Sequence, residues 1–177
     1  DDYYGAKVMV NKFKGSQKIA AYGILANDGM VGLGFEDGQK YGVGGSGNVT
    51  MMDGGGIMIS SDGNSSDGGW DGKYYGSGVP KALNYGASYS DKTTNDKHKI
   101  NINYKRNQLD VDNRNTYMAQ DNLPGQARIE NSITDTERED RIHTANLRYD
   151  VKLDSLSDLT VNMGFNKSNN YNSSKTT

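Results

Sequence analysis

Residues 143 to 167 alternate between apolar and polar side chains with a period of two. The alternation comes in two segments, which the polar stretch at 154–158 separates. Its apolar positions are Ala145, Leu147, Tyr149, Val151, Leu153, Leu159, Val161, Met163 and Phe165. Because successive side chains of a strand point to opposite faces, the pattern predicts a β-hairpin with one apolar face over about 139–167.

Two further strand pairs are predicted, over about 4–26 and 81–111. The apolar positions of the second pair are Leu83, Tyr85, Ala87, Tyr89, Ile100, Ile102 and Tyr104. The phase slips between Tyr104 and Leu109, which indicates a β-bulge or the point at which the strand leaves a membrane. In the first pair, residues 19–26 are apolar on both faces, so the pattern leaves the outward side of that pair open.

The connections between these strands differ greatly in length. Three are short turns, whereas 27–80 is long and rich in Gly and Asp, and 112–138 is long and charged. Outer-membrane barrels have short turns on the periplasmic rim and long loops on the extracellular rim. The alternation of short and long connections therefore predicts an all-β, antiparallel, up-and-down transmembrane β-barrel segment of about six strands. Residues 1–177 would form part of one barrel domain, with extracellular loops at 27–80 and 112–138.

The composition fits such a barrel better than a soluble domain. Only 33% of the 177 residues are hydrophobic, mean hydropathy is -0.83, and the chain has 23 Gly and 12 Tyr. A soluble domain is nearer half apolar, whereas a barrel needs lipid-facing side chains at only one position in two. No run of 18 apolar residues predicts a membrane helix, and the net charge of -2, with both signs interspersed, gives no basic surface for nucleic acid. The start of the chain has no signal peptide and its end is polar, so we interpret it as a piece of a longer barrel.

The alternating apolar positions are the predicted lipid-facing residues. They are Leu83, Tyr85, Tyr89, Ile100, Ile102, Tyr104, Leu147, Tyr149, Val151, Leu153, Leu159, Val161, Met163 and Phe165, with Ala87 and Ala145 between them. None is charged, and the intervening positions suit a hydrated lumen. A sheet survives in hydrocarbon only if it closes without an edge, so six strands require additional strands to complete a barrel. The alternative is a soluble sheet with these residues turned inward.

Several stretches resemble the barrel region of the TonB-dependent receptor and outer-membrane β-barrel family. They are Lys14–Gly23, Gly32–Asp37, Gly78–Pro80 leading to Asn84–Ser90, and Tyr149–Ser155. The resemblance implies a Gram-negative outer-membrane location and TonB-powered uptake of a ligand such as a siderophore, glycan or peptide. It implies outer-membrane lipid, the rest of the barrel, a plug domain and the TonB complex as partners. Neither a plug nor a TonB-binding segment is seen in this stretch of sequence.

Few residues suggest chemistry. The only histidines, His98 and His143, lie near strand starts without a nucleophile at a recognisable spacing, so we expect no catalytic residue, no cofactor and no metal site, and not an enzyme. Trp70, Tyr74 and Tyr75 lie in the glycine-rich connection and are candidates for stacking on a ligand; the competing interpretation is that they pack the loop on itself or on the barrel. Two other functions stay open: a structural or adhesive barrel without transport, and a secreted soluble β-sheet protein.

Overall fold

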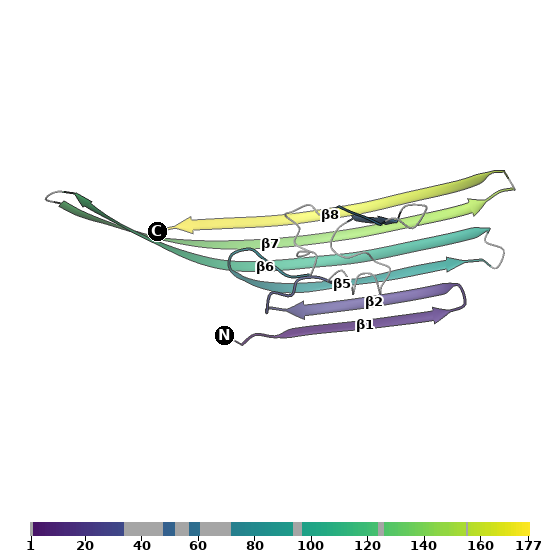
Figure 1. The fold of residues 1–177 in the computed structure, drawn as a ribbon, viewed down its shortest axis with the longest axis horizontal. Coiled ribbons are helices and arrows are strands. Elements are labelled where there is room, and N and C mark those ends of the chain that lie inside the picture. The colour runs from purple at the N-terminus through teal and green to yellow at the C-terminus, as the bar shows by residue number, and fades with distance from the viewer. Residues whose placement is uncertain are drawn as a thin grey trace.

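In the computed structural model, six long strands form a single antiparallel sheet (Figure 1). The structure describes residues 2–33, 48–51, 57–60, 72–93, 97–123, 126–154 and 156–177. The strands of the sheet are β1 (Gly5–Lys14), β2 (Gln17–Ala26), β5 (Val79–Lys92), β6 (His98–Leu123), β7 (Gln126–Lys152) and β8 (Asp158–Thr176), in that spatial order. A separate hairpin, β3 (Asn48–Met51) and β4 (Ile57–Ser60), belongs to the connection between β2 and β5.

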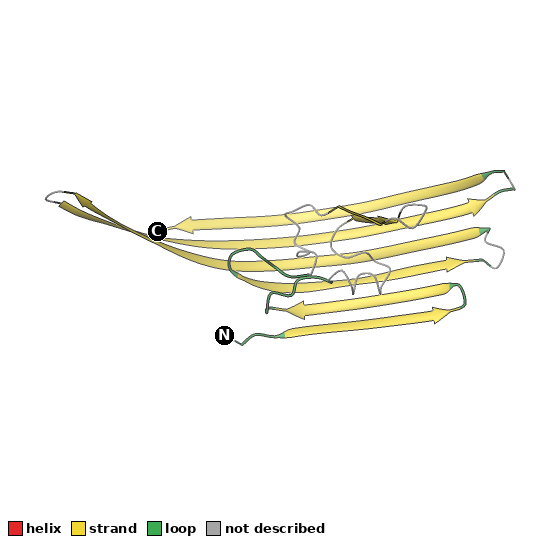
Figure 2. Ribbon diagram, in the orientation of Figure 1, coloured by secondary structure: helices red, strands yellow, loops and turns green. Residues whose placement is uncertain are grey.

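The prediction of an all-β, up-and-down antiparallel sheet is confirmed. Strands that follow one another along the sheet are also consecutive in the chain, apart from the excursion through β3 and β4. The described residues contain strands, turns and loops but no helix, as Figure 2 shows. The sheet has two unpaired edges, at β1 and β8, so within this chain it is open.

The segment at 112–138, which the sequence predicts as a long loop, belongs to β6 up to Leu123 and to β7 from Gln126, while its place outside the cell stays a prediction. β6 and β7 pair without interruption from His98↔Val151 to Leu123↔Gln126. The hairpin projects past the ends of the neighbouring strands (Figure 1). Apolar and polar residues alternate along a strand when one of its faces is shielded from water, so the alternation indicates such shielding and not the strand conformation itself. A ribbon that meets water on both faces carries no such signal.

An ion pair joins β6 and β7 at the base of this projecting ribbon. Arg114 on β6 donates to both carboxylate oxygens of Asp135 on β7, from Nε at 2.7 Å and from Nη2 at 3.0 Å. The two residues are directly opposite in the ladder. Hydrogen bonding from the guanidinium lowers the pKa of Asp135, so the carboxylate keeps its charge in moderately acidic solution.

Two other sequence predictions, one on the end of a strand and one on a bulge within a strand, are also corrected. β8 continues to Thr176, beyond the predicted end near 167, because its polar residues pair with the equally polar part of β7. No bulge interrupts β6 between Tyr104 and Leu109, since its register with β5 and β7 is continuous. The apolar side chains change from one face of the sheet to the other at this point, and the alternative that the strand leaves a membrane here stays a prediction.

Directly paired residues of an antiparallel sheet lie on the same face, so the register assigns every side chain to one of two faces. All predicted lipid-facing residues within the strands fall on one face, which we call the open face. The register also shows which side of the first hairpin lies on the open face. Its apolar residues on that face are Ala6, Val8, Val10, Ile19, Ala21 and Leu25. The opposite, covered face of β2 carries Ala20, Ile24 and Ala26, which explains why β2 is apolar on both sides.

Candidate functional site

The open face carries a band of exposed apolar side chains across all six strands. Met163 is 63% exposed, Phe165 57% and Val8 65%, and none of the predicted lipid-facing residues belongs to the buried core. In a soluble sheet with an inward apolar face, Leu147, Val151 and Val161 would lie in a dry interior, yet they remain half-exposed. Soluble monomers rarely expose contiguous apolar patches larger than a few hundred Å². The band is therefore the most unusual surface in the described part of the chain.

The band crosses the strands obliquely. One row of paired residues begins apolar on β1 and ends charged on β8: Val8, Gly23, Tyr85, Arg106, His143 and Lys167. A second row of paired residues, nearer the short turns, shows the reverse change from charged to apolar. It begins with Asp91 on β5 and continues through Ile100, Tyr149 and Val161. The centre of the uncharged stretch thus shifts by about one residue per strand. That shift is about 3.3 Å along the strand for about 4.8 Å across the sheet, which gives a tilt of about 35°.

Tyr104 marks the edge of the band on the side of the long connections, because the next residue on the same face of β6 is Arg106, whereas Tyr85 lies near the middle of the uncharged stretch of β5. The Tyr85 hydroxyl accepts a hydrogen bond from Arg106 Nη1 at 3.3 Å, and the guanidinium lies 5.9 Å from the centre of the Tyr85 ring. The Tyr104 hydroxyl is 2.9 Å from Nδ1 of His143. Each ring belongs to the band while its hydroxyl bonds a polar group beyond it.

At the opposite edge, on the side of the short turns, Tyr89 has the corresponding place, next to Asp91 on the same face of β5. The Tyr89 hydroxyl accepts from Gln17 Nε2 at 3.2 Å and donates to Asp91 Oδ2 at 3.2 Å. The Tyr149 hydroxyl is 2.8 Å from Nδ1 of His98, and the two rings are stacked with their centroids 6.1 Å apart. Both histidines of the chain are therefore polar partners of tyrosines on the open face.

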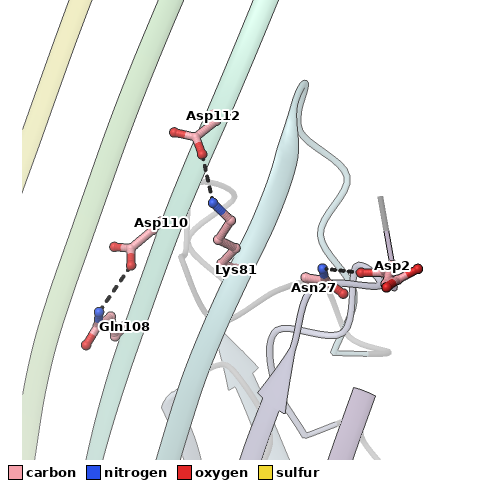
Figure 3. A network of polar contacts seen from close by, with 6 residues as sticks. All are labelled: Asp2, Asn27, Lys81, Gln108, Asp110 and Asp112. Atoms are coloured by element: carbon pink, nitrogen blue, oxygen red, sulfur yellow. Dashed lines mark hydrogen bonds and ion pairs between the residues drawn. The ribbon is translucent and has the colours of Figure 1, made fainter. Parts of the chain in front are cut away.

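Beyond the tyrosines on the long-connection side, the open face becomes charged (Figure 3). Lys81 Nζ lies 3.0 Å from Asp112 Oδ2, and Gln108 Nε2 donates to Asp110 Oδ2 at 3.1 Å. The change from uncharged to charged side chains takes place within two positions on β5 and on β6. The band thus has a sharp boundary.

The covered face is partly overlaid by the connection between β2 and β5. Residues 29–33 and 72–74, which we call the strap, pair with each other: Val31 and Gly32 donate to the carbonyl of Gly72 at 2.8 and 3.0 Å. Two buried clusters hold the strap to the sheet. They comprise Leu33 with Ala20, Ile24 and Ala26, and Val31 with Ala82, Leu109 and Val111.

Asn84 fixes the strap at its centre. This residue of β5 is only 1% exposed. Its amide nitrogen donates to the carbonyl of Val31, and its amide oxygen accepts from the backbone N–H of Gln108 at 2.9 Å. One buried side chain therefore satisfies a strap acceptor and a sheet donor together. The sequence pattern places Asn84 only among the polar alternating positions and carries no signal for this role.

Of the three predicted ligand-binding aromatics, the structure describes Tyr74 and Tyr75. Tyr74 packs against the cluster of Val31 and Leu109 and donates its hydroxyl to the carbonyl of Ser77 at 3.1 Å, so its ring has a structural role. Tyr75 is 74% exposed and its role in ligand binding stays a prediction. Trp70 lies outside the described residues.

Toward the short turns the covered face of β5 to β8 is polar, and we call this surface the polar wall. It consists of Ser88, Ser90, Lys92, Lys99, Asn101, Asn103, Lys105, Thr144, Asn146, Arg148, Asp150, Lys152, Asp158, Thr160, Asn162, Gly164 and Asn166. Its contacts are polar: Asn146 donates to Asn103 at 3.1 Å, and Thr160 donates to Asp150 at 2.6 Å. Such a surface suits water and solutes.

The described residues contain no grouping of three or more His, Asp or Glu side chains that could hold a metal ion. Nor do they include a helix with the length and hydrophobicity needed to cross a membrane. Comparison with protein-family models, curated proteins and solved structures finds no match to this chain.

Proposed function

We propose that this chain forms part of the wall of an outer-membrane β-barrel of the TonB-dependent transporter and receptor type, which binds a ligand outside the cell and takes it up. The observation that carries the proposal is the uncharged open-face band with tyrosines at both edges. Aromatic girdles of this kind lie at the two membrane interfaces of barrels, where a ring contacts lipid and a hydroxyl contacts water.

The dimensions of the band support a membrane crossing. On the open face, β5 carries no charged side chain between Lys81 and Asp91, and β2 carries none from Gln17 to Asn27. Ten residues extend about 33 Å along a strand, which at a tilt of about 35° is about 27 Å along the barrel axis. Transmembrane barrels have strands tilted by about 35–45° and an apolar band about 25 Å tall.

In this proposal the covered face lines the lumen and the strap folds inward over it. The short turns face the periplasm, while the β2–β5 connection and the β6–β7 ribbon face the exterior. The free edges at β1 and β8 require further strands, because unpaired backbone groups are costly in hydrocarbon. The resemblance to TonB-dependent receptors supplies the specific proposal of a plug domain and the TonB complex as partners.

Fractionation and uptake test this function together. The full-length protein, expressed in a Gram-negative host, is expected in the outer membrane with a heat-modifiable gel shift. Cells are then offered a fluorescent ferric siderophore, a fluorescent oligosaccharide and a fluorescent oligopeptide. We expect several-fold accumulation of one of them, lost when TonB is deleted.

The other outcomes favour the alternatives. Outer-membrane location with no TonB-dependent accumulation of any probe would favour a structural or adhesive barrel. Recovery of the protein in the soluble fraction would favour a secreted β-sheet protein and remove the proposal.

A further inference from the structure

Directly beyond the band, the open face of β6, β7 and β8 has a row of basic side chains. The row consists of Arg106, His143 and Lys167, which are directly paired across the three strands, and we call it the basic row. On each strand it follows the last residue of the band, which is Tyr104, Ala145 or Phe165. The basic row therefore lies at the boundary between the uncharged and the charged part of this face, on the side of the long connections.

No acid of the described strands is next to Arg106 or Lys167 on the open face. Arg106 is directly opposite Tyr85 and His143, while Lys167 is directly opposite His143. The next row outward has no acid either, since it consists of Leu83, Gln108, Arg141 and Asn169. The basic row thus has no counter-charge among its neighbours in the ladder.

The acids that follow on β6 and β7 lie further out. Asp110 and Glu139 are four residues beyond the basic row, which is about 13 Å along a strand. This separation exceeds the Debye length of about 8 Å at physiological ionic strength. Glu139 is also matched already, because its Oε2 lies 2.9 Å from Nη2 of Arg141.

Arg106 itself contacts only neutral groups. Its Nη1 donates to the Tyr85 hydroxyl at 3.3 Å, and its Nη2 donates to Oε1 of Gln108 at 3.4 Å. Hydrogen bonds from a guanidinium to a carboxylate or phosphate are shorter, at about 2.7–2.9 Å. Among the described residues, Arg106 Nε is buried and has no acceptor. The guanidinium therefore retains donors and a positive charge for a further partner.

A second row on the same three strands and the same face shows the contrast. It consists of Arg114, Asp135 and Lys175. Arg114 donates to both carboxylate oxygens of Asp135, which is also directly opposite Lys175. This row thus contains its own counter-charge, whereas the central position of the basic row is His143, whose Nδ1 lies 2.9 Å from the Tyr104 hydroxyl.

The band beside the basic row suits the apolar part of a lipid. Met163 and Phe165, which precede Lys167 on the same face of β8, are 63% and 57% exposed. A phospholipid has its phosphate directly beside its acyl chains, so one molecule can contact both surfaces. Guanidinium and ammonium groups bind phosphate oxygens through charge-assisted hydrogen bonds. A soluble anion or an acidic peptide would leave the neighbouring apolar side chains in water.

We infer that the basic row binds the phosphate of a lipid headgroup whose acyl chains lie on the band, in the leaflet on the side of the long connections. The inference rests on the proposed function, because the open face contacts lipid only in a membrane barrel. Each Lys or Arg beside anionic headgroups strengthens binding by about fivefold.

Native mass spectrometry of the full-length protein in detergent tests this inference by measuring the affinities of two lipids with the same acyl chains. The probes are dioleoyl phosphatidic acid, which has an exposed phosphate, and zwitterionic dioleoyl phosphatidylcholine. A heat-modifiable gel shift first establishes that each sample is a folded barrel, so that failure of the proposed function is seen separately. Phosphatidic acid is expected to bind at least about tenfold more tightly, as two basic side chains require. Excess inorganic phosphate is expected to leave it bound.

The double variant Arg106→Gln with Lys167→Gln is expected to lose this preference. Its matched control is Arg114→Gln with Lys175→Gln, which removes the same two residue types from the same strands and face and is expected to keep the native preference. Lys167→Gln alone changes an exposed side chain, so folding is preserved, and it is expected to lower the affinity for phosphatidic acid about fivefold.

Three results would overturn the inference. They are equal affinity of the folded barrel for the two lipids, an equal loss in the two double variants, and an unchanged affinity for phosphatidic acid in the Lys167→Gln variant. Displacement of phosphatidic acid by inorganic phosphate would also contradict it, because the row would then be a site for free anions.

Discussion

Met163→Arg is expected to destabilise the folded barrel in lipid by about 2 to 4 kcal/mol, the range found for a cationic side chain near the bilayer midplane on the lipid face of a barrel. Met163 lies in the middle of the open-face stretch of β8 and is directly paired with Leu147. At 63% exposure it has ample room for an arginine. The expected cost therefore comes from the surrounding hydrocarbon and not from steric overlap. Urea titration of the full-length barrel in phospholipid vesicles, followed by the heat-modifiable gel shift, measures this cost.

The control is the next residue on the same strand. Asn162→Arg places the same side chain on the covered face, where Asn162 is exposed among polar neighbours, and we expect a change within about 0.5 kcal/mol. In a soluble protein both substitutions would be at exposed positions and both would be nearly neutral. An equal and small effect of the two variants would therefore contradict a lipid-facing band.

Asn84→Ala is expected to loosen the strap. The substitution removes the side-chain partner of the buried carbonyl of Val31 and of the part-buried backbone N–H of Gln108. A buried acceptor left unsatisfied costs about 1–3 kcal/mol, which is the destabilisation that we expect from the carbonyl of Val31. Chymotrypsin cleavage after Tyr74, which packs against the sheet while the strap is in place, followed by mass spectrometry, reports release of the strap.

Asn101→Ala serves as the control for this variant, because Asn101 lies on the same face of the neighbouring strand but is exposed. We expect its cleavage rate and its urea midpoint to match those of the native protein. If Asn84→Ala behaved in the same way, the strap would be held by its apolar contacts alone and the role assigned to the Asn84 amide would be wrong.

The open-face band was predictable from the sequence because its cause is local. Each strand alternates by itself, so Leu147 and Val161 could be assigned to one face without knowing which strands are neighbours. The first hairpin needed the pairing register, since Ile19 and Ile24 are both apolar and lie on opposite faces of β2.

The features of the fold that the sequence did not predict depend on contacts between distant segments. Asn84 contacts Val31 only because the β2–β5 connection folds back over the sheet. A glycine-rich stretch has no hydrophobic periodicity from which such a contact could be predicted. Leu109 is apolar on the covered face for the same reason, which explains the phase slip on β6. The strands beyond Asp112 were missed because a ribbon with two hydrated faces has no alternation to detect.

In the proposed barrel the open face contacts lipid and the covered face contacts water. A spin label placed at each position from 143 to 167 of the full-length protein in bilayers tests it, with collision rates measured for oxygen and for a water-soluble nickel complex. We expect oxygen maxima at the odd positions from Ala145 to Leu153 and from Leu159 to Phe165, with nickel maxima at the even positions between them. Uniform accessibility to nickel, or oxygen maxima at the even positions, would contradict it.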